Sequence, residues 1–200
     1  MAAYGMVPMQ MAGSSYMTGG FDQFAITLLT AVDIFYGDLV RFDAATGTVI
    51  RGVAPVAATP ALGVFVGCRY VNESNEQKYA QHYVGSSVAG NRKEAYAYVV
   101  TDPDVVFKIQ GQYSTAAAFA QAEIGQIVNP TVAAGSTTTG LSGNYVDLDD
   151  AGADSKALRV IGLVENGSNE APAGGTSTTY DILVKWNPVV TVYGSNSTAA

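Results

Sequence analysis

The sequence predicts an all-β protein built from small β-barrel or β-sandwich units. Three observations lead to this prediction: short runs rich in β-branched and aromatic residues recur along the chain, Gly, Pro, Asn and Asp separate these runs, and only one stretch has the composition of a helix. With 200 residues, the chain can form one domain with a sizeable core or two small domains.

The first hairpin is expected between residues 36 and 50. Leu39 and Phe42 are the apolar residues of a short alternation, residues 43–47 have the composition of a turn, and β-branched residues return at 48–50. A linker with two prolines then leads to the apolar run at 61–67. We therefore predict two paired strands followed by a third.

The same order of signals returns in the second half of the chain. The echo relates the runs at 36–42, 48–50 and 61–67 to the runs at 125–128, 145–148 and 157–164, although few residues are identical. It predicts two β-units, at 33–112 and 125–194, within one β-rich domain of residues 33–194. The sequence leaves open whether these units close into one barrel or two.

Further strands are expected at 78–84, 96–100, 105–110, 180–186 and 189–193. In the run at 105–110, Val105, Phe107 and Ile109 share one face, which is typical of a half-buried antiparallel strand. The segment Thr101-Asp102-Pro103-Asp104 before it favours a type I turn, because Asp suits the first position of that turn and Pro the second.

One short helix is expected near 114–123. Ser114 and Thr115 can cap its N-terminus, the alanine-rich run at 116–123 has high helix propensity, and Gly125 can end it. Such a helix would connect the two units. Residues 195–200 are expected to form a flexible C-terminal tail.

Residues 1–32 differ in composition from the rest of the chain. They contain all five methionines, many Gly and Ser residues, and a single charged residue, Asp22. Gly and Ser give little intrinsic order, whereas Met and aromatic side chains are costly to leave in water. We therefore predict an extended N-terminal arm that becomes ordered on a partner, through Tyr4, Met6, Met9, Met11, Tyr16, Met17, Phe21 and Phe24. The alternative is an arm that folds back on its own core.

The overall composition favours an assembly component. Charged residues make up 14% of the chain and hydrophobic residues 48%, against about 25% charged in a typical soluble protein. The uncharged surface that results is easier to explain if other subunits cover it. The formal net charge of −7 would repel a polyphosphate backbone, so nucleic-acid binding is not expected. The longest uncharged apolar run, at 24–32, is too short to cross a membrane.

The sequence assigns no catalytic, cofactor or metal site. The chain has one histidine, His82, between tyrosines on an expected strand, and one cysteine, Cys68, which is expected to be a buried apolar residue. The run from Asp147 to Asp154 copies the start of an EF-hand loop, but Leu158 stands where that loop needs its bidentate Glu. An acidic turn is the preferred interpretation, and cation binding there stays open.

Several short motifs together suggest a family. The motifs are Gly37-Asp38-Leu39-Val40, Thr48-Val49, Ala61-Leu62-Gly63-Val64 and Ala97-Tyr98-Val99-Val100. Their layout resembles that of the small β-barrel decoration, or cement, proteins of tailed-bacteriophage heads, over residues 37–110 and more weakly over 125–193. The resemblance implies a non-enzymatic virion protein on the outside of the capsid, which binds the major capsid protein and copies of itself as a dimer or trimer. It also implies that residues 1–24 form a capsid-binding arm. This chain is longer than the single-barrel members, which leaves the oligomeric state open.

Two other functions remain as alternatives. A tail, fibre or collar component would share the β-rich composition and the loops rich in Gly, Ser and Thr. A carbohydrate-binding adhesin module could use some of the twelve tyrosines and Trp186 as a stacking surface. Such aromatic residues more often belong to cores and interfaces.

Overall fold

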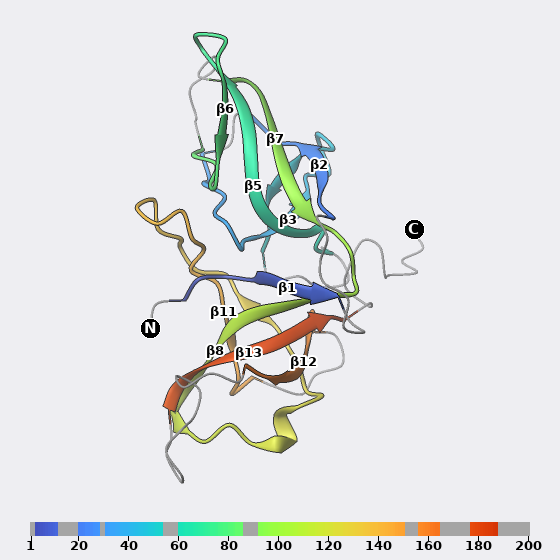
Figure 1. The fold of residues 1–200 in the computed structure, drawn as a ribbon, viewed down its shortest axis with the longest axis vertical. Coiled ribbons are helices and arrows are strands. Elements are labelled where there is room, and N and C mark those ends of the chain that lie inside the picture. The colour runs from blue at the N-terminus through green and yellow to red at the C-terminus, as the bar shows by residue number, and fades with distance from the viewer. Residues whose placement is uncertain are drawn as a thin grey trace.

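The protein is all-β, as predicted (Figure 1). The computed structural model describes residues 3–11, 20–28, 31–53, 60–85, 92–150, 156–164 and 177–187. These residues form thirteen strands and one short 3₁₀ turn, Gln121–Glu123. The strands make two sheets, one above the other in Figure 1, and we call the two parts unit 1 and unit 2.

Unit 1 is a closed ring of five strands. Its strands are β2 (Asp22–Ala25), β3 (Leu39–Phe42), β4 (Val49–Arg51), β5 (Gly63–Asn72), β6 (Gln77–Ala80) and β7 (Arg92–Val100), and the order in the sheet is β2-β7-β5-β3-β4. Ile26, directly after β2, forms a parallel bridge with Val49 of β4, and the Thr27 N–H donates to the Val49 carbonyl at 3.2 Å. This contact joins the two ends of the sheet. Strand β6 lies outside the ring, on β5.

Unit 2 is closed in a similar way. Its strands are β8 (Val105–Ala117), β9 (Ile127–Val128), β10 (Pro130–Thr131), β11 (Tyr145–Asp147), β12 (Leu158–Leu163) and β13 (Ser177–Trp186), and β1 (Val7–Met11) is added to the edge of β8. Only Asn129 separates β9 from β10, and β9 pairs with β12 while β10 pairs with β11. The Asn129 side chain also accepts from the Ala157 N–H at 3.0 Å. One bent strand therefore joins the two ends of this sheet.

The two rings have the same topology. In chain order, the five strands of unit 1 are β2, β3, β4, β5 and β7, and those of unit 2 are β8, β9/β10, β11, β12 and β13. In each ring the fifth strand lies between the first and the fourth, and the second lies between the fourth and the third. Each ring also has one parallel pair, between the first strand and the third.

The register of the strands agrees as well. Val49 of the third strand faces Ile26 of the first in unit 1, and Val146 faces Gly111 in unit 2. The fourth strand has a β-bulge in both units, before Gly67 and before Gly162. Because bulges disrupt the ladder locally and fix its register, this agreement indicates two copies of one β-unit in series.

The boundaries of the units differ from the predicted 33–112 and 125–194. Strand β8 is the first strand of unit 2, so the change of sheet falls in the turn at 101–104. Strand β2 is the first strand of unit 1 and lies within the segment predicted as an arm. The echo in the sequence begins at the second strand of each unit, since the first strands differ most in length, with 4 residues in β2 and 13 in β8.

The predicted helix at 114–123 is wrong. Strand β8 continues to Ala117, where it pairs with Ser177 of β13, and only the 3₁₀ turn Gln121–Glu123 follows. The Tyr180 hydroxyl donates to the Ala117 carbonyl at 2.7 Å. Pairing with β13 thus overrides the helix propensity of the alanines. That propensity favours Ala over other ordinary residues by at most about 0.7 kcal/mol per residue.

The two units share an apolar interface. The core of unit 2 extends beyond its own ring and includes four unit 1 residues, Leu39, Ala61, Val64 and Val100. A second cluster fills the ring of unit 1: Ile26, Ile34, Val40, Val49, Leu62, Phe65, Cys68, Tyr83, Ala95, Ala97 and Val99. The side chains of β3 and β5 therefore alternate between the inside of their own ring and the surface that faces unit 2.

A buried carboxylate connects the units across this interface. Asp38, just before β3, has no exposed surface, and it accepts from the Phe35 N–H at 2.9 Å. Oδ1 of Asp38 accepts from the Ser142 hydroxyl at 2.6 Å. The Arg51 Nε lies 2.9 Å from Oδ2, the oxygen that also accepts from Phe35. Arg51 also donates to the carbonyl of Ala133. Since Ser142 and Ala133 belong to unit 2, Asp38 and Arg51 fix the position of one unit on the other.

The environment of Asp38 has opposing effects on its pKa. Burial raises the pKa of the carboxyl, while the Phe35 N–H, the Ser142 hydroxyl and Arg51 lower it, and the net direction is upward. Folding therefore becomes less favourable as this carboxyl ionises.

This leads to a prediction for Asp38→Asn, which keeps the shape and removes the titration. We compare the free energy of unfolding of the native protein with that of this variant. The difference should fall as the pH rises from 3.8, the ordinary pKa of an Asp carboxyl, through the raised pKa of Asp38, and it should stay level at higher pH. Urea unfolding from pH 4 to pH 8 measures the difference. Asp104→Asn, at an exposed pair with Lys185, is the control. A difference that increases with pH in that window would contradict the raised pKa.

Candidate functional site

The two residues with the most reactive side chains are held in structural roles. The His82 ring stacks on Phe35, with 5.6 Å between the ring centroids and 13° between the planes. Cys68 is buried, as expected, and its thiol donates to the His82 main-chain carbonyl at 3.7 Å rather than to the imidazole. Within the described ranges, no three His, Cys, Asp or Glu side chains come together as a metal site.

The acidic run that starts at Asp147 is organised as a turn over its described part, Asp147 to Asp150. Asp147 accepts from the Asp149 N–H at 3.0 Å, and Asp149 accepts from the Ser114 N–H at 2.6 Å. The Ser114 N–H lowers the pKa of Asp149. Asp150 pairs with Lys156 at 2.9 Å. Asp154 lies outside the described residues.

The predicted arm is in part an element of the protein's own core. Strand β1 pairs antiparallel with β8 over Val105 to Lys108, and Met6 just before it is fully buried. The Met6 N–H donates to the Gly37 carbonyl at 3.0 Å, and the Gly5 N–H donates to the Asn144 carbonyl at 3.2 Å. In Figure 1, β1 crosses the middle of the molecule at the edge of the unit 2 sheet that faces unit 1. For residues 3–11, the prediction of an arm ordered only by a partner is therefore corrected.

The physical reason is the length of β8. Strand β11 covers β8 only at Gly111 and Gln112, which leaves the main-chain groups of Val105 to Lys108 without a strand on that side. Strand β1 supplies these hydrogen bonds from within the same chain.

Tyr4 strengthens the attachment of β1. Its hydroxyl donates to Asp181 at 2.6 Å, and the Lys108 ammonium lies 4.9 Å from the centre of its ring. Burial raises the pKa of Tyr4, and the hydrogen bond to Asp181 raises it further. Tyr4 thus stays a neutral hydrogen-bond donor at any physiological pH.

The other side chains predicted for the arm differ in how far they are buried. Met9 and Phe21 are about half exposed, at 48% and 50%. Phe24 is partly buried on β2 and packs edge-on against Phe42, with 5.5 Å between the ring centroids. The side chain of Met11 and the whole of Tyr16 and Met17 lie outside the described residues. Of the eight, Met9 and Phe21 are the described side chains that a partner could reach without unfolding the chain.

Exposed apolar side chains are more frequent on unit 1. Among the described residues, the large exposed ones are Phe21, Val32, Val53, Tyr79 and Val84 on or beside unit 1, Ile124 and Ile161 on unit 2, and Met9 on β1. Phe21 also lies edge-on against Tyr98, with 5.1 Å between the ring centroids. Over the described part of the chain, unit 1 therefore has more large exposed apolar side chains than unit 2.

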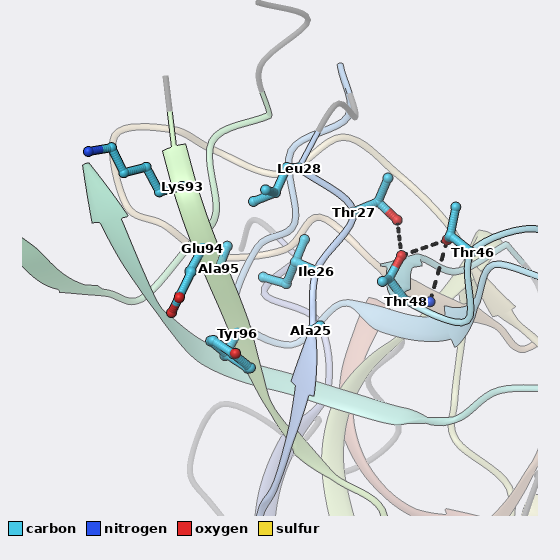
Figure 2. A pocket seen from close by; sticks show the side chains of 10 residues that line it. All are labelled: Ala25, Ile26, Thr27, Leu28, Thr46, Thr48, Lys93, Glu94, Ala95 and Tyr96. Carbon is cyan, nitrogen blue, oxygen red and sulfur yellow. Dashed lines mark hydrogen bonds between the residues drawn. The ribbon is translucent and has the colours of Figure 1, made fainter. Parts of the chain in front are cut away.

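Unit 1 also has an apolar groove at the point where its ring closes (Figure 2). The cavity has a volume of about 540 Å³. Its lining consists of Ala25, Ile26, Thr27, Leu28, Thr46, Thr48, Lys93, Glu94, Ala95 and Tyr96. Ile26 and Leu28 lie between the end of β2 and the start of β7 in Figure 2, and the three threonines lie on the opposite side.

The threonines form a small hydrogen-bonded ladder. The Thr48 hydroxyl is 2.5 Å from that of Thr27 and 2.7 Å from that of Thr46. Because these hydroxyls bond to one another, the groove presents methyl groups and apolar side chains over most of its surface. Lys93 and Glu94 are exposed at its other edge.

Sequence reasoning did not predict this groove. Its walls come from β2, from the turn between β3 and β4, and from the start of β7, which meet only when Ile26 pairs with Val49. The sequence signal for it is the apolar run at 24–32, whose periodicity alone does not distinguish a strand from a short helix.

The comparisons with known proteins found no matching family model, no matching curated protein and no matching solved structure. Over the described ranges, none of the helical structure has the length and apolar character needed to span a membrane.

The burial of β1 leads to a prediction with a matched pair of variants. Met6→Ala removes a fully buried side chain, so we expect it to lower the free energy of unfolding by about 2–5 kcal/mol. Met9→Ala changes a side chain that is 48% exposed, and its effect should stay within about 0.5 kcal/mol. Urea unfolding of the isolated protein measures both. Equal effects of the two substitutions would contradict the docking of β1 on its own chain.

Proposed function

We propose that this protein is a non-enzymatic structural component of a virion, a decoration protein that binds the outer surface of a phage head and stabilises contacts between capsomers. The proposal of a decoration protein starts from the resemblance of residues 37–110 to that family. Two features of the structure support it: the chain is all-β with two small closed rings, and its accessible surface includes an apolar groove.

The observation that carries the proposal is the combination of low charge with an open apolar groove. Charged residues make up only 14% of the chain, and the groove of about 540 Å³ lies on the unit that also has most of the exposed apolar side chains. Single exposed apolar residues are ordinary on monomers, but an apolar groove of this size is typical of a binding site. A decoration protein requires such a surface, because it must bind its neighbours on the shell.

The two-unit architecture suits this role. The shared core and the Asp38 cluster hold the units as one rigid body, so a contact made by unit 1 also positions unit 2. A rigid body that touches two neighbouring capsomers resists their separation, since little conformational entropy is lost when it binds. In this proposal the partners are the major capsid protein and other copies of the chain.

Purified particles provide the test. We expect protein mass spectrometry to find this chain in heads purified from its source, and electron microscopy of those heads to place two stacked β-rings per copy on the outer surface. Absence of the chain from purified particles would overturn the proposal. Density confined to the tail would overturn the head assignment and support the tail alternative.

Substitutions at exposed arm residues test the contact itself. Removing residues 1–24 would also remove β1 and β2 from their sheets, so point changes are the sharper choice. We expect Phe21→Asp and Met9→Asp together to lower occupancy on stripped heads at least tenfold, because a charge would enter an apolar contact. Ile161→Asp, at an exposed apolar residue of unit 2, is the control and should leave occupancy unchanged. Equal occupancy for both variants would rule out the arm residues as a capsid contact.

A further inference from the structure

The groove of unit 1 can be compared with the same place in unit 2, because the two rings have the same register. Phe24 pairs with Ala97 in unit 1 as Ile109 pairs with Ile182 in unit 2. Two residues further on, Ile26 corresponds to Gly111. The Ile26 N–H donates to the Ala95 carbonyl, and Gly111 pairs with Tyr180, so Ala95 corresponds to Tyr180. By the same register, Leu28 corresponds to Tyr113.

In unit 2 this place is filled by aromatic side chains of the chain itself. Tyr180 is 3% exposed, and its ring lies 5.9 Å from that of Tyr113 and 5.8 Å from that of Phe119, between centroids. The cavity that remains there has a volume of about 170 Å³ and is lined by Gln112, Tyr113, Ser114, Tyr145 and Asp147. The unit 1 groove has about 540 Å³, because Ala95 and Leu28 stand where unit 2 has two tyrosines.

Among the described residues, no strand continues β2 beside the groove. In unit 2, β8 follows β13 as far as the pairing of Ala117 with Ser177. In unit 1, β2 pairs with β7 only from Tyr96 onward, and the chain then turns away so that Thr27 bonds to Val49. Among the described residues, Lys93 and Glu94 therefore have a strand on their β5 side only.

We propose that the groove of unit 1 binds an extended segment of a partner protein that carries an aromatic side chain. The segment adds as a strand to β7 beside Lys93, on the side away from β5. Its aromatic ring enters the groove above Ala95 and Leu28, in the place that Tyr180 and Tyr113 fill in unit 2. A cavity of this size falls within the range of about 300–1,000 Å³ that is usual for binding pockets. This binding site is a property of the ring and does not depend on a capsid partner.

A segment of this chain provides a peptide with which binding to the groove can be tested. A synthetic peptide of residues 112–120 copies the segment that covers this place in unit 2, with Tyr113 and Phe119 in it. We expect titration of the full-length protein with this peptide to shift the backbone amide NMR signals of residues 93–96 and 25–28. A peptide with Ala at both aromatic positions should bind at least tenfold more weakly. A matching shift with the Ala peptide would overturn the role of the aromatic ring.

Two variants on the protein side complete the test. Ala25→Asp places a charge in the groove, and Leu28→Tyr fills it with the residue of unit 2; each should weaken peptide binding at least tenfold. Gln23→Asp is the matched control, since Gln23 is exposed on the same strand outside the groove and should change binding less than twofold. Equal loss with Gln23→Asp would overturn the site. Binding of free 4-methylphenol as tightly as the peptide would overturn the added strand, because a small aromatic ligand makes no ladder.

Discussion

Closure of each sheet into a ring is the constraint on which the rest of the structure depends. Each ring combines long strands with very short ones: β2, β3 and β4 of unit 1 have 4, 4 and 3 residues, and β9, β10 and β11 of unit 2 have 2, 2 and 3. Closing the ring removes the sheet edges and encloses the side chains that point inward. In unit 1 this closure comes from the pairing of Ile26 with Val49, and in unit 2 from the bent strand β9/β10 at Asn129. The groove and the inner core both follow from it.

The contact between the rings determines how the two units are arranged relative to one another. A carboxylate without exposed surface is expensive to bury, and a guanidinium, a hydroxyl and a main-chain N–H must all reach Asp38 to offset that cost. Apolar contacts alone would allow the rings to slide, whereas these donors come from fixed positions in both units. The cluster therefore contributes more to one defined arrangement of the units than to stability. It also explains why Gly37 and Ser142, far apart in the sequence, lie at the same interface.

Much of the fold could be predicted from local sequence. The hairpin of β3 and β4 has clear turn and strand signals, and the echo in the second half correctly indicates a repeated unit. Three features depend on contacts that local sequence does not contain. The alanines at 116–117 are strand because Ser177 and Tyr180 hold them, Met6 is buried because β8 has room at its edge, and the groove exists because unit 1 has Ala95 where unit 2 has Tyr180. Each is a long-range effect that outweighs intrinsic preference.

The pairing of β1 also constrains the order in which the molecule can be assembled during synthesis. Strand β1 is synthesised before its partner residues Val105 to Lys108, which follow about one hundred residues later. Asp181, which accepts from the Tyr4 hydroxyl, is 177 residues away. Unit 1 has all its strands before that point. Strand β1 is thus synthesised well before its partners in unit 2, and it can pair and hold the two rings together only after they have been made.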